Sequence, residues 1–150
     1  MERKKIMAHQ ATLQLLKKCD TEVKKGITSI KSVSEVIQNP DFKLMAMEIK
    51  DELKKCEAEI SKQQTALKEA QKEESKVAET LSKLVANTKL LLEKTDKHIA
   101  SLLFDDCNNA LKTLYTAVND YALAEKDTTY LAIRIIQTMI DLRENLVAYL

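Results

Sequence analysis

The sequence predicts an all-α protein, an antiparallel up-down-up-down four-helix bundle. Apolar residues recur every three or four positions over nearly all of the 150 residues, which is the spacing of one face of a helix. Gly26 and Pro40 are the only glycine and the only proline, so the chain has little turn chemistry. Hydrophobic residues make up 45% of the chain and aromatic residues only 4%, a balance that suits helices better than a β-sandwich. We expect one domain over residues 1–150, with short reversals between long helices.

The first helix is expected over about residues 4–38, where an apolar seam follows a 4–3 spacing. Asn39 and Pro40 end this helix, because proline disfavours helix at the preceding residue and cannot donate to the previous turn. The same pair begins the next helix. Asn39 can cap free N–H groups, Pro40 suits the first helical position, and Asp41 complements the positive end of the helix dipole.

Three further helices complete the expected bundle. They cover about residues 40–72, 76–123 and 128–150. The apolar pattern weakens at 71–76, and we place the second reversal there although no glycine or proline marks it. The phase of the pattern shifts near 94–96, where Thr95 or Asp96 can cap a fresh start, so a kink or short break is expected inside the third helix.

Charge and the length of apolar runs limit the expected partners and location. Twenty-four basic and twenty-three acidic side chains are mixed along the chain, so there is no basic face for nucleic acid. The longest strictly apolar runs are too short to span a bilayer, and the first residues lack the continuous apolar stretch of a secretory signal. Three widely separated cysteines suit a reducing compartment and a role as small buried side chains. We expect a cytoplasmic protein.

A four-helix core is best known chemically for carboxylate-bridged di-metal sites. Such a site takes a glutamate from each of two helices and Glu-x-x-His from each of the other two, because residues three apart share a helical face. The chain has two histidines, His9 and His98, and neither has a glutamate three positions before it. The standard di-iron ligand set is therefore absent from the sequence.

Three residues remain as candidate metal ligands: Asp20, Asp106 and His98. The two aspartates occupy positions in the apolar seams, and a buried carboxylate must be paired, coordinated or neutralised. The competing interpretation is that each aspartate reaches water or a lysine at an edge of the core, and that His98 is a partly exposed residue at a helix end. The sequence does not decide between these interpretations.

Catalytic chemistry has little support in the sequence. Cys107 follows Asp105 and Asp106, an acidic setting that would raise the pKa of the thiol rather than activate it. No glycine-rich phosphate loop is present. We therefore expect no catalytic residues and no cofactor, and we favour a protein that is not an enzyme.

Four short motifs stand out along the chain: Val23–Ile30, Asn39–Lys43, Asp96–Leu103 and Glu144–Leu150. Together they resemble small bacterial proteins of the ferritin-like superfamily, and the resemblance covers roughly residues 13–150. It implies a left-handed four-helix bundle built as a pair of hairpins. In metal-binding relatives a glutamate often follows the glycine of the first helix, where this chain has Ile27. The resemblance therefore implies a ferritin-like bundle without the metals.

Two functions from different classes follow. The first is a non-catalytic bundle that acts as a homodimer or by binding a protein partner, because apolar residues outside the main seams widen the apolar stripe. These residues are Ile6, Met7, Met45, Met47, Leu90, Leu92, Ile133, Ile136 and Ile140. The alternative explanation is that they complete a wide core face. The second function is a ferritin-like metal-binding protein or oxidoreductase with a non-standard carboxylate site. A further possible function is that of a coiled-coil adaptor whose helices continue through residues 71–76.

Overall fold

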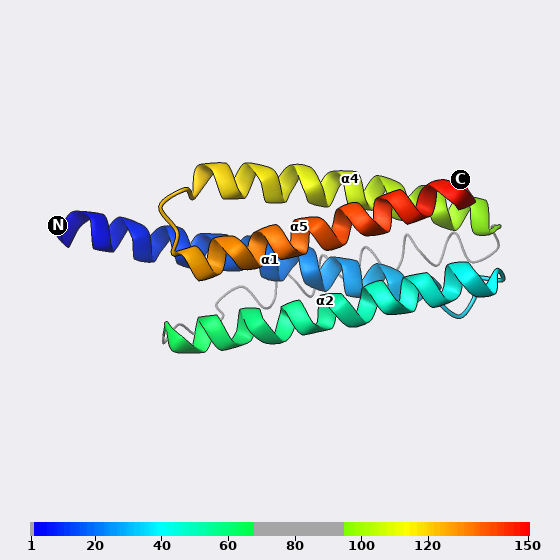
Figure 1. Cartoon of the computed structure of the whole chain (residues 1–150), viewed down its shortest axis with the longest axis horizontal. Coiled ribbons are helices and arrows are strands. Elements are labelled where there is room, and N and C mark those ends of the chain that lie inside the picture. The colour runs from blue at the N-terminus through cyan, green and yellow to red at the C-terminus, as the bar shows by residue number, and fades with distance from the viewer. Residues whose placement is uncertain (1, 68–94) are drawn as a thin grey trace.

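The computed structural model describes residues 2–67 and 95–150, which form four long helices packed side by side (Figure 1). Their bounds are α1 Glu2–Val33, α2 Pro40–Ala66, α4 Asp96–Asp120 and α5 Lys126–Leu146, and a short 3₁₀ turn, Val147–Tyr149, follows α5. The predicted all-α antiparallel four-helix bundle is confirmed. The reversal expected at 71–76 and the part of the third helix expected before residue 95 lie outside the described residues.

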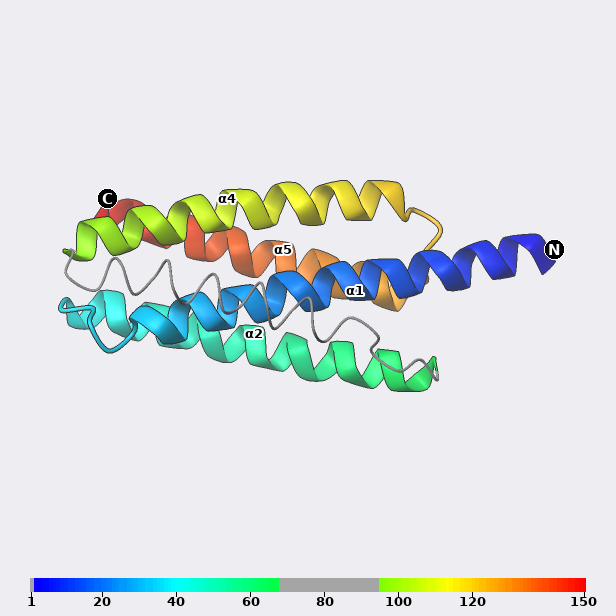
Figure 2. The ribbon, with the colours of Figure 1, turned by 180° about the vertical axis from the view of Figure 1, so that it is seen from behind.

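The direction of the helices is clear in Figures 1 and 2. Each helix packs against antiparallel neighbours, in the pairs α1–α2, α4–α5, α2–α5 and α1–α4. The helices α1 and α5 run in the same direction and touch across the middle of the bundle. Direction therefore alternates within each of the two hairpins, but α2 and α4 both begin at the same end.

The start of α2 follows the sequence pattern closely. Asn39 is the N-cap, and its side-chain oxygen accepts hydrogen bonds from the backbone N–H groups of Asp41 at 2.9 Å and Phe42 at 3.1 Å. Pro40 takes the first helical position, where a missing N–H costs nothing. The preceding helix, α1, ends earlier than the apolar seam of the sequence predicts. It stops at Val33, and residues 34–36 form a turn.

The start of α4 is tied to the turn between α1 and α2. The carboxylate of Asp96 accepts the backbone N–H of Gln38 at Oδ1, 2.9 Å, and that of Asn39 at Oδ2, 2.8 Å. Thr95 precedes it with an extended backbone as the N-cap residue of α4. A separate helix therefore begins at Asp96, because its side chain binds another part of the chain and Thr95 leaves the helical conformation.

The opposite end of the bundle is held by two threonines. Thr12 of α1 accepts the backbone N–H of Glu125 at 2.9 Å, and Thr128 of α5 donates to the side-chain carbonyl of Gln63 of α2 at 2.7 Å. Both threonines are buried. The turn between α4 and α5 is thus fixed against α1 and α2.

The core runs the length of the bundle and is centred on α1. Between residues 11 and 30 of this helix, only Gln14 and Lys18 are exposed. The largest fully buried side chains come from all four described helices: Leu15, Leu16, Val23, Ile30, Phe42, Leu53, Ile60, Ile99, Leu103, Leu114, Ile135 and Leu146. The ring of Phe42 also stacks on Tyr149, with centroids 4.5 Å apart, which fixes the end of the chain against α2.

Replacing Asp96 with alanine should destabilise the bundle. The change leaves the N–H groups of Gln38 and Asn39 without their acceptor, at an expected cost of about 1–2 kcal/mol. Urea unfolding followed by circular dichroism measures this loss. The neighbouring exposed Lys97→Ala is the matched control and should change stability by less than about 0.5 kcal/mol. Equal stability of the Asp96→Ala variant and the unchanged protein would show that the two bonds contribute nothing.

Candidate functional site

Asp20 lies on α1 and is only 6% exposed. Its Oδ2 accepts a hydrogen bond from Lys24, one helical turn later, at 3.0 Å. An aspartate in an apolar seam was expected to reach water or a lysine, and Oδ2 of Asp20 does reach a lysine. Its Oδ1 is buried and has no hydrogen-bond partner.

Asp106 lies on α4 and faces α1. Its Oδ2 accepts a hydrogen bond from the hydroxyl of Ser29 at 3.3 Å. Burial raises the pKa of this carboxyl to about 6, while the bond from Ser29 and the nearby Lys25 act in the opposite direction. The cost of burying the charge thus outweighs the favourable contacts, and the group gains a proton more readily than an ordinary aspartate.

Glu22 is a buried acid that the sequence analysis did not select. It is 5% exposed and pairs with Lys25 on the same helix at 3.3 Å. Burial raises its pKa, and Lys25 partly offsets the shift. In the sequence it stands in a charged stretch that is typical of a solvated helix face, so periodicity gives no sign of its burial.

His98 lies in the exposed first turn of α4, with its Nδ1 3.0 Å from the hydroxyl of Thr95. This contact stays within the helix start. Among the residues that the structure describes, no group of three or more His, Cys, Asp or Glu side chains comes together in a way that could hold a metal ion. The described part of the chain therefore forms a four-helix bundle without a metal-binding cluster.

The three cysteines are buried and free, as expected of small core side chains. Burial raises the pKa of Cys19 and that of Cys107 to about 12, and it also raises the pKa of Cys56. Because the thiolate is the reactive form, none of them is activated as a nucleophile.

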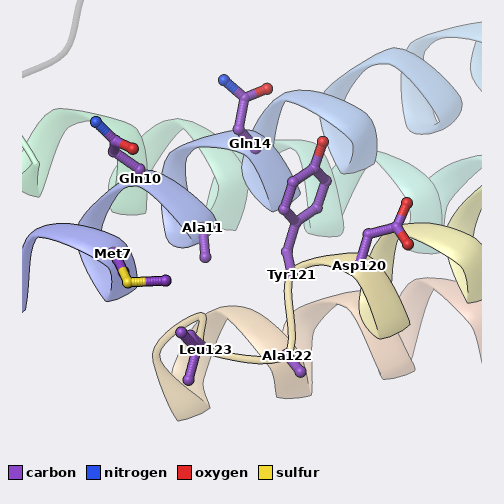
Figure 3. Close-up of a pocket in the computed structure, with 8 residues that line it drawn as sticks. All are labelled: Met7, Gln10, Ala11, Gln14, Asp120, Tyr121, Ala122 and Leu123. Carbon is purple, nitrogen blue, oxygen red and sulfur yellow. The ribbon is translucent and has the colours of Figure 1, made fainter. Parts of the chain in front are cut away.

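The hollow in Figure 3 lies where the turn between α4 and α5 meets the first part of α1. It measures about 300 Å³ and is lined by Met7, Gln10, Ala11, Gln14, Asp120, Tyr121, Ala122 and Leu123. The side chains of α1 face those of residues 120–123 across it. Its lining has one carboxylate, Asp120, and lacks a partner acid, a histidine or a cysteine. This hollow offers a surface for contact rather than groups for a reaction.

A second strip, in which four of six residues are apolar, runs along the outer side of α5 and into the short turn that follows it. Its six residues follow a 3–4 spacing: Tyr130, Ile133, Gln137, Ile140, Glu144 and Val147. The core residues of the same helix, such as Ile135 and Leu142, lie on the other side. Tyr130 is 64% exposed, Ile133 43% and Val147 53%. We call these six residues the outer strip of α5.

The apolar residues that the sequence placed outside the main seams divide between the core and the surface. Ile136 is buried, Met45, Met47 and Ile140 are partly buried, and Met7 and Ile133 are exposed. Leu90, Leu92 and the side chain of Ile6 lie outside the part of the chain that the structure describes. A wide core face therefore accounts for some of these residues and leaves others on the surface.

A groove between α2 and α5 adjoins the outer strip. It measures about 350 Å³ and is lined by Asp41, Leu44, Met45, Glu48, Ile49, Asp141 and Asn145. Its apolar residues, including the 60% exposed Leu44, are accompanied by three carboxylates. The groove can take an apolar side chain that carries a hydrogen-bond donor at its tip.

Comparison of the chain with protein-family models, curated proteins and solved structures gives no match. Over residues 2–67 and 95–150, no helix is both long and apolar enough to cross a membrane.

The raised pKa of Asp106 predicts a pH-dependent stability. Between about pH 4 and pH 6 the folded state holds this proton more tightly than the unfolded chain, so stability should fall as pH rises through that window and then level off. Asp106→Asn should remove this contribution and stabilise the protein near pH 8 by about 1 kcal/mol, a value reduced for partial exposure. Urea unfolding at several pH values measures both effects.

The matched control is Asp51→Asn, which changes an exposed aspartate in the middle of α2. Its pH profile should follow that of the unchanged protein. A profile of Asp106→Asn that also runs parallel to the unchanged protein would contradict the assigned pKa.

Proposed function

We propose that this protein is a non-catalytic helical bundle that acts by associating with a second copy of itself. The observation that carries the proposal is the outer strip of α5, where Tyr130, Ile133 and Val147 keep helical spacing on a face that no described helix covers. A helix on the surface of a monomer normally turns polar residues outward. Apolar residues at regular spacing on an outer face are typical of a helix that packs against a partner.

The buried groups support the same proposal. Each buried acid on α1 pairs with a lysine of the same helix, and the cysteines are deep in the core with raised pKa values. These groups serve packing and do not converge on a common point. Free cysteines also favour the cytoplasm as the location.

A ferritin-like architecture without metals is part of the proposal. Its support is the direction of the described helices, because α2 and α4 begin at the same end of the bundle. Ferritin-like bundles likewise consist of two antiparallel hairpins whose second and third helices share a direction. The short motifs named in the sequence analysis point the same way.

The alternative function, metal binding at a non-standard carboxylate site, has one observation in its favour. Oδ1 of Asp20 is buried and without a hydrogen-bond partner, and a cation is one way to satisfy such an atom. Against it, Asp20 is already paired with Lys24, and a metal site needs several ligands that meet.

Sedimentation velocity of the full chain over a wide range of concentration tests the proposed function. We expect a concentration-dependent species with the mass of two 17.0 kDa chains, because burying the outer strip removes apolar surface from water. A chain that remains monomeric at every concentration would refute self-association.

Metal loading tests the alternative. The protein is incubated anaerobically with ferrous, manganous and zinc ions, desalted exhaustively and subjected to elemental analysis. We expect no stoichiometric metal to remain. Near-stoichiometric metal that is lost in Asp20→Asn or Asp106→Asn and kept in Asp51→Asn would instead establish a carboxylate site and overturn this expectation.

A further inference from the structure

The outer strip of α5 has the spacing of a coiled-coil seam. Positions 130, 133, 137, 140, 144 and 147 are separated by three and four residues in strict alternation, which is the heptad pattern that keeps one helix in continuous contact with another. The exposed side of α2 contrasts with it, because there the exposed residues include Lys54, Lys55 and Lys62. One helix of this bundle thus carries two seams, one in the core and one on the surface, and in the surface seam Ile140 also packs against the core.

We propose that the outer strips of two copies pack antiparallel across a two-fold axis at Gln137 and form a homodimer. This inference rests on the proposed function and names the surface through which the chain associates with itself. In Figure 1 α5 lies in front of the bundle with α1 behind it, and none of the other described helices lies in front of it.

The positions in the strip suit a two-fold axis. A dimer with this symmetry uses the same surface on both copies. With the axis at Gln137, Ile133 lies next to Ile140 of the partner subunit, and each copy contributes the same pair. Gln137 then lies against Gln137 of the partner subunit. A side-chain amide can both donate a hydrogen bond to another amide and accept one from it.

The charges on α5 favour the antiparallel orientation. Lys126 and Arg134 lie in its first half, and Asp141 and Glu144 lie in its second half. Antiparallel packing brings Arg134 near Asp141 of the partner subunit, whereas parallel packing sets like charges against each other. Arg134 binds Glu52 of its own chain through Nε and one terminal nitrogen, at 2.9 and 2.8 Å. Its guanidinium has further donors for a second carboxylate.

Two other charges on α5 do not oppose this pairing. Asp127 belongs to the first turn, where it complements the helix dipole. Arg143 is directed within its own chain, toward Asn108 at 3.3 Å and Glu144 at 3.4 Å.

The groove between α2 and α5 lies where the same axis places Tyr130 of the partner subunit. Asp141 and Asn145 line this groove. Along α5 they lie after Gln137 and Tyr130 lies before it, and their distances from Gln137 agree with that of Tyr130 to within about one helical turn. Leu44, Met45 and Ile49 give the aromatic ring an apolar surface. The carboxylates of the groove can accept the phenol O–H, the hydrogen bond that tyrosine needs when it becomes buried.

Ile133→Lys tests the interface directly. Sedimentation velocity should show at least a tenfold increase in the dimer dissociation constant, because the lysine would lie against an apolar side chain at the centre of the contact. Tyr115→Lys is the matched control, since Tyr115 is also an exposed apolar residue, 49% exposed, but lies on α4. Far-UV circular dichroism and urea unfolding should show that both variants fold.

Cysteine cross-linking tests the axis and the orientation without weakening the fold. The native cysteines are buried, so an added surface cysteine is the reactive one. Gln137→Cys should form a disulfide-linked dimer under mild oxidation, and Lys54→Cys, on the exposed side of α2, should not. A mixture of Tyr130→Cys and Glu144→Cys chains should give a mixed dimer, whereas Tyr130→Cys alone should not link to itself.

The results of these experiments distinguish a failure of the proposed interface from a failure of the proposed function. Suppose that the unchanged chain is a dimer, that the Ile133→Lys variant is still a dimer and that Gln137→Cys forms no disulfide-linked dimer. The inference is then wrong, and self-association through another surface stands. Self-linking of Tyr130→Cys would also overturn it, because it would indicate parallel helices. A monomeric unchanged chain would overturn both the inference and the proposed function.

Discussion

The burial of α1 between residues 11 and 30, where only Gln14 and Lys18 are exposed, is the constraint on which the rest of the structure depends. This helix touches α2, α4 and α5, so its side chains have to meet several neighbours at once. Gly26 shows how tight the fit is, because a Cβ at this position would lie 3.0 Å from Cδ1 of Leu53 and 3.1 Å from Cε of Met139. The absence of a side chain allows α2 and α5 to approach the same point of α1.

That constraint also explains the chemistry of the buried acids. A polar group on a helix with almost no exposed side has to be satisfied nearby. Asp20 and Glu22 find lysines three or four residues later on the same helix, and Asp106 finds Ser29 across the contact between α1 and α4. The proposed function therefore uses the surface of the bundle rather than its interior.

Much of the fold could be predicted from the sequence, because apolar spacing and the Asn39–Pro40 pair act locally. The burial of Glu22 could not be predicted, since it depends on how many helices surround α1. The bonds from Asp96 to Gln38 and Asn39 could not be predicted for a similar reason: they join distant parts of the chain, and the sequence pattern indicates only that Asp96 can cap its own helix. The candidate ligands Asp20, Asp106 and His98 were selected by position in a seam or by residue type, which does not reveal what they face. Of the outer strip of α5, only Ile133 and Ile140 were predicted to lie outside the main seams, because apolar spacing alone does not show which residues the fold leaves exposed.

The hydrogen bonds at the two ends of the bundle have a mechanical consequence. Asp96 holds α4 to the turn before α2 at one end, and at the other end Thr12 holds the turn after α4 to α1. Packed helices can slide along each other by one turn, about 5.4 Å, while keeping similar apolar contacts. Here such a slip would break polar bonds at both ends together. The two hairpins are therefore locked in axial register, and an apolar bundle that would otherwise tolerate several alignments keeps a single one.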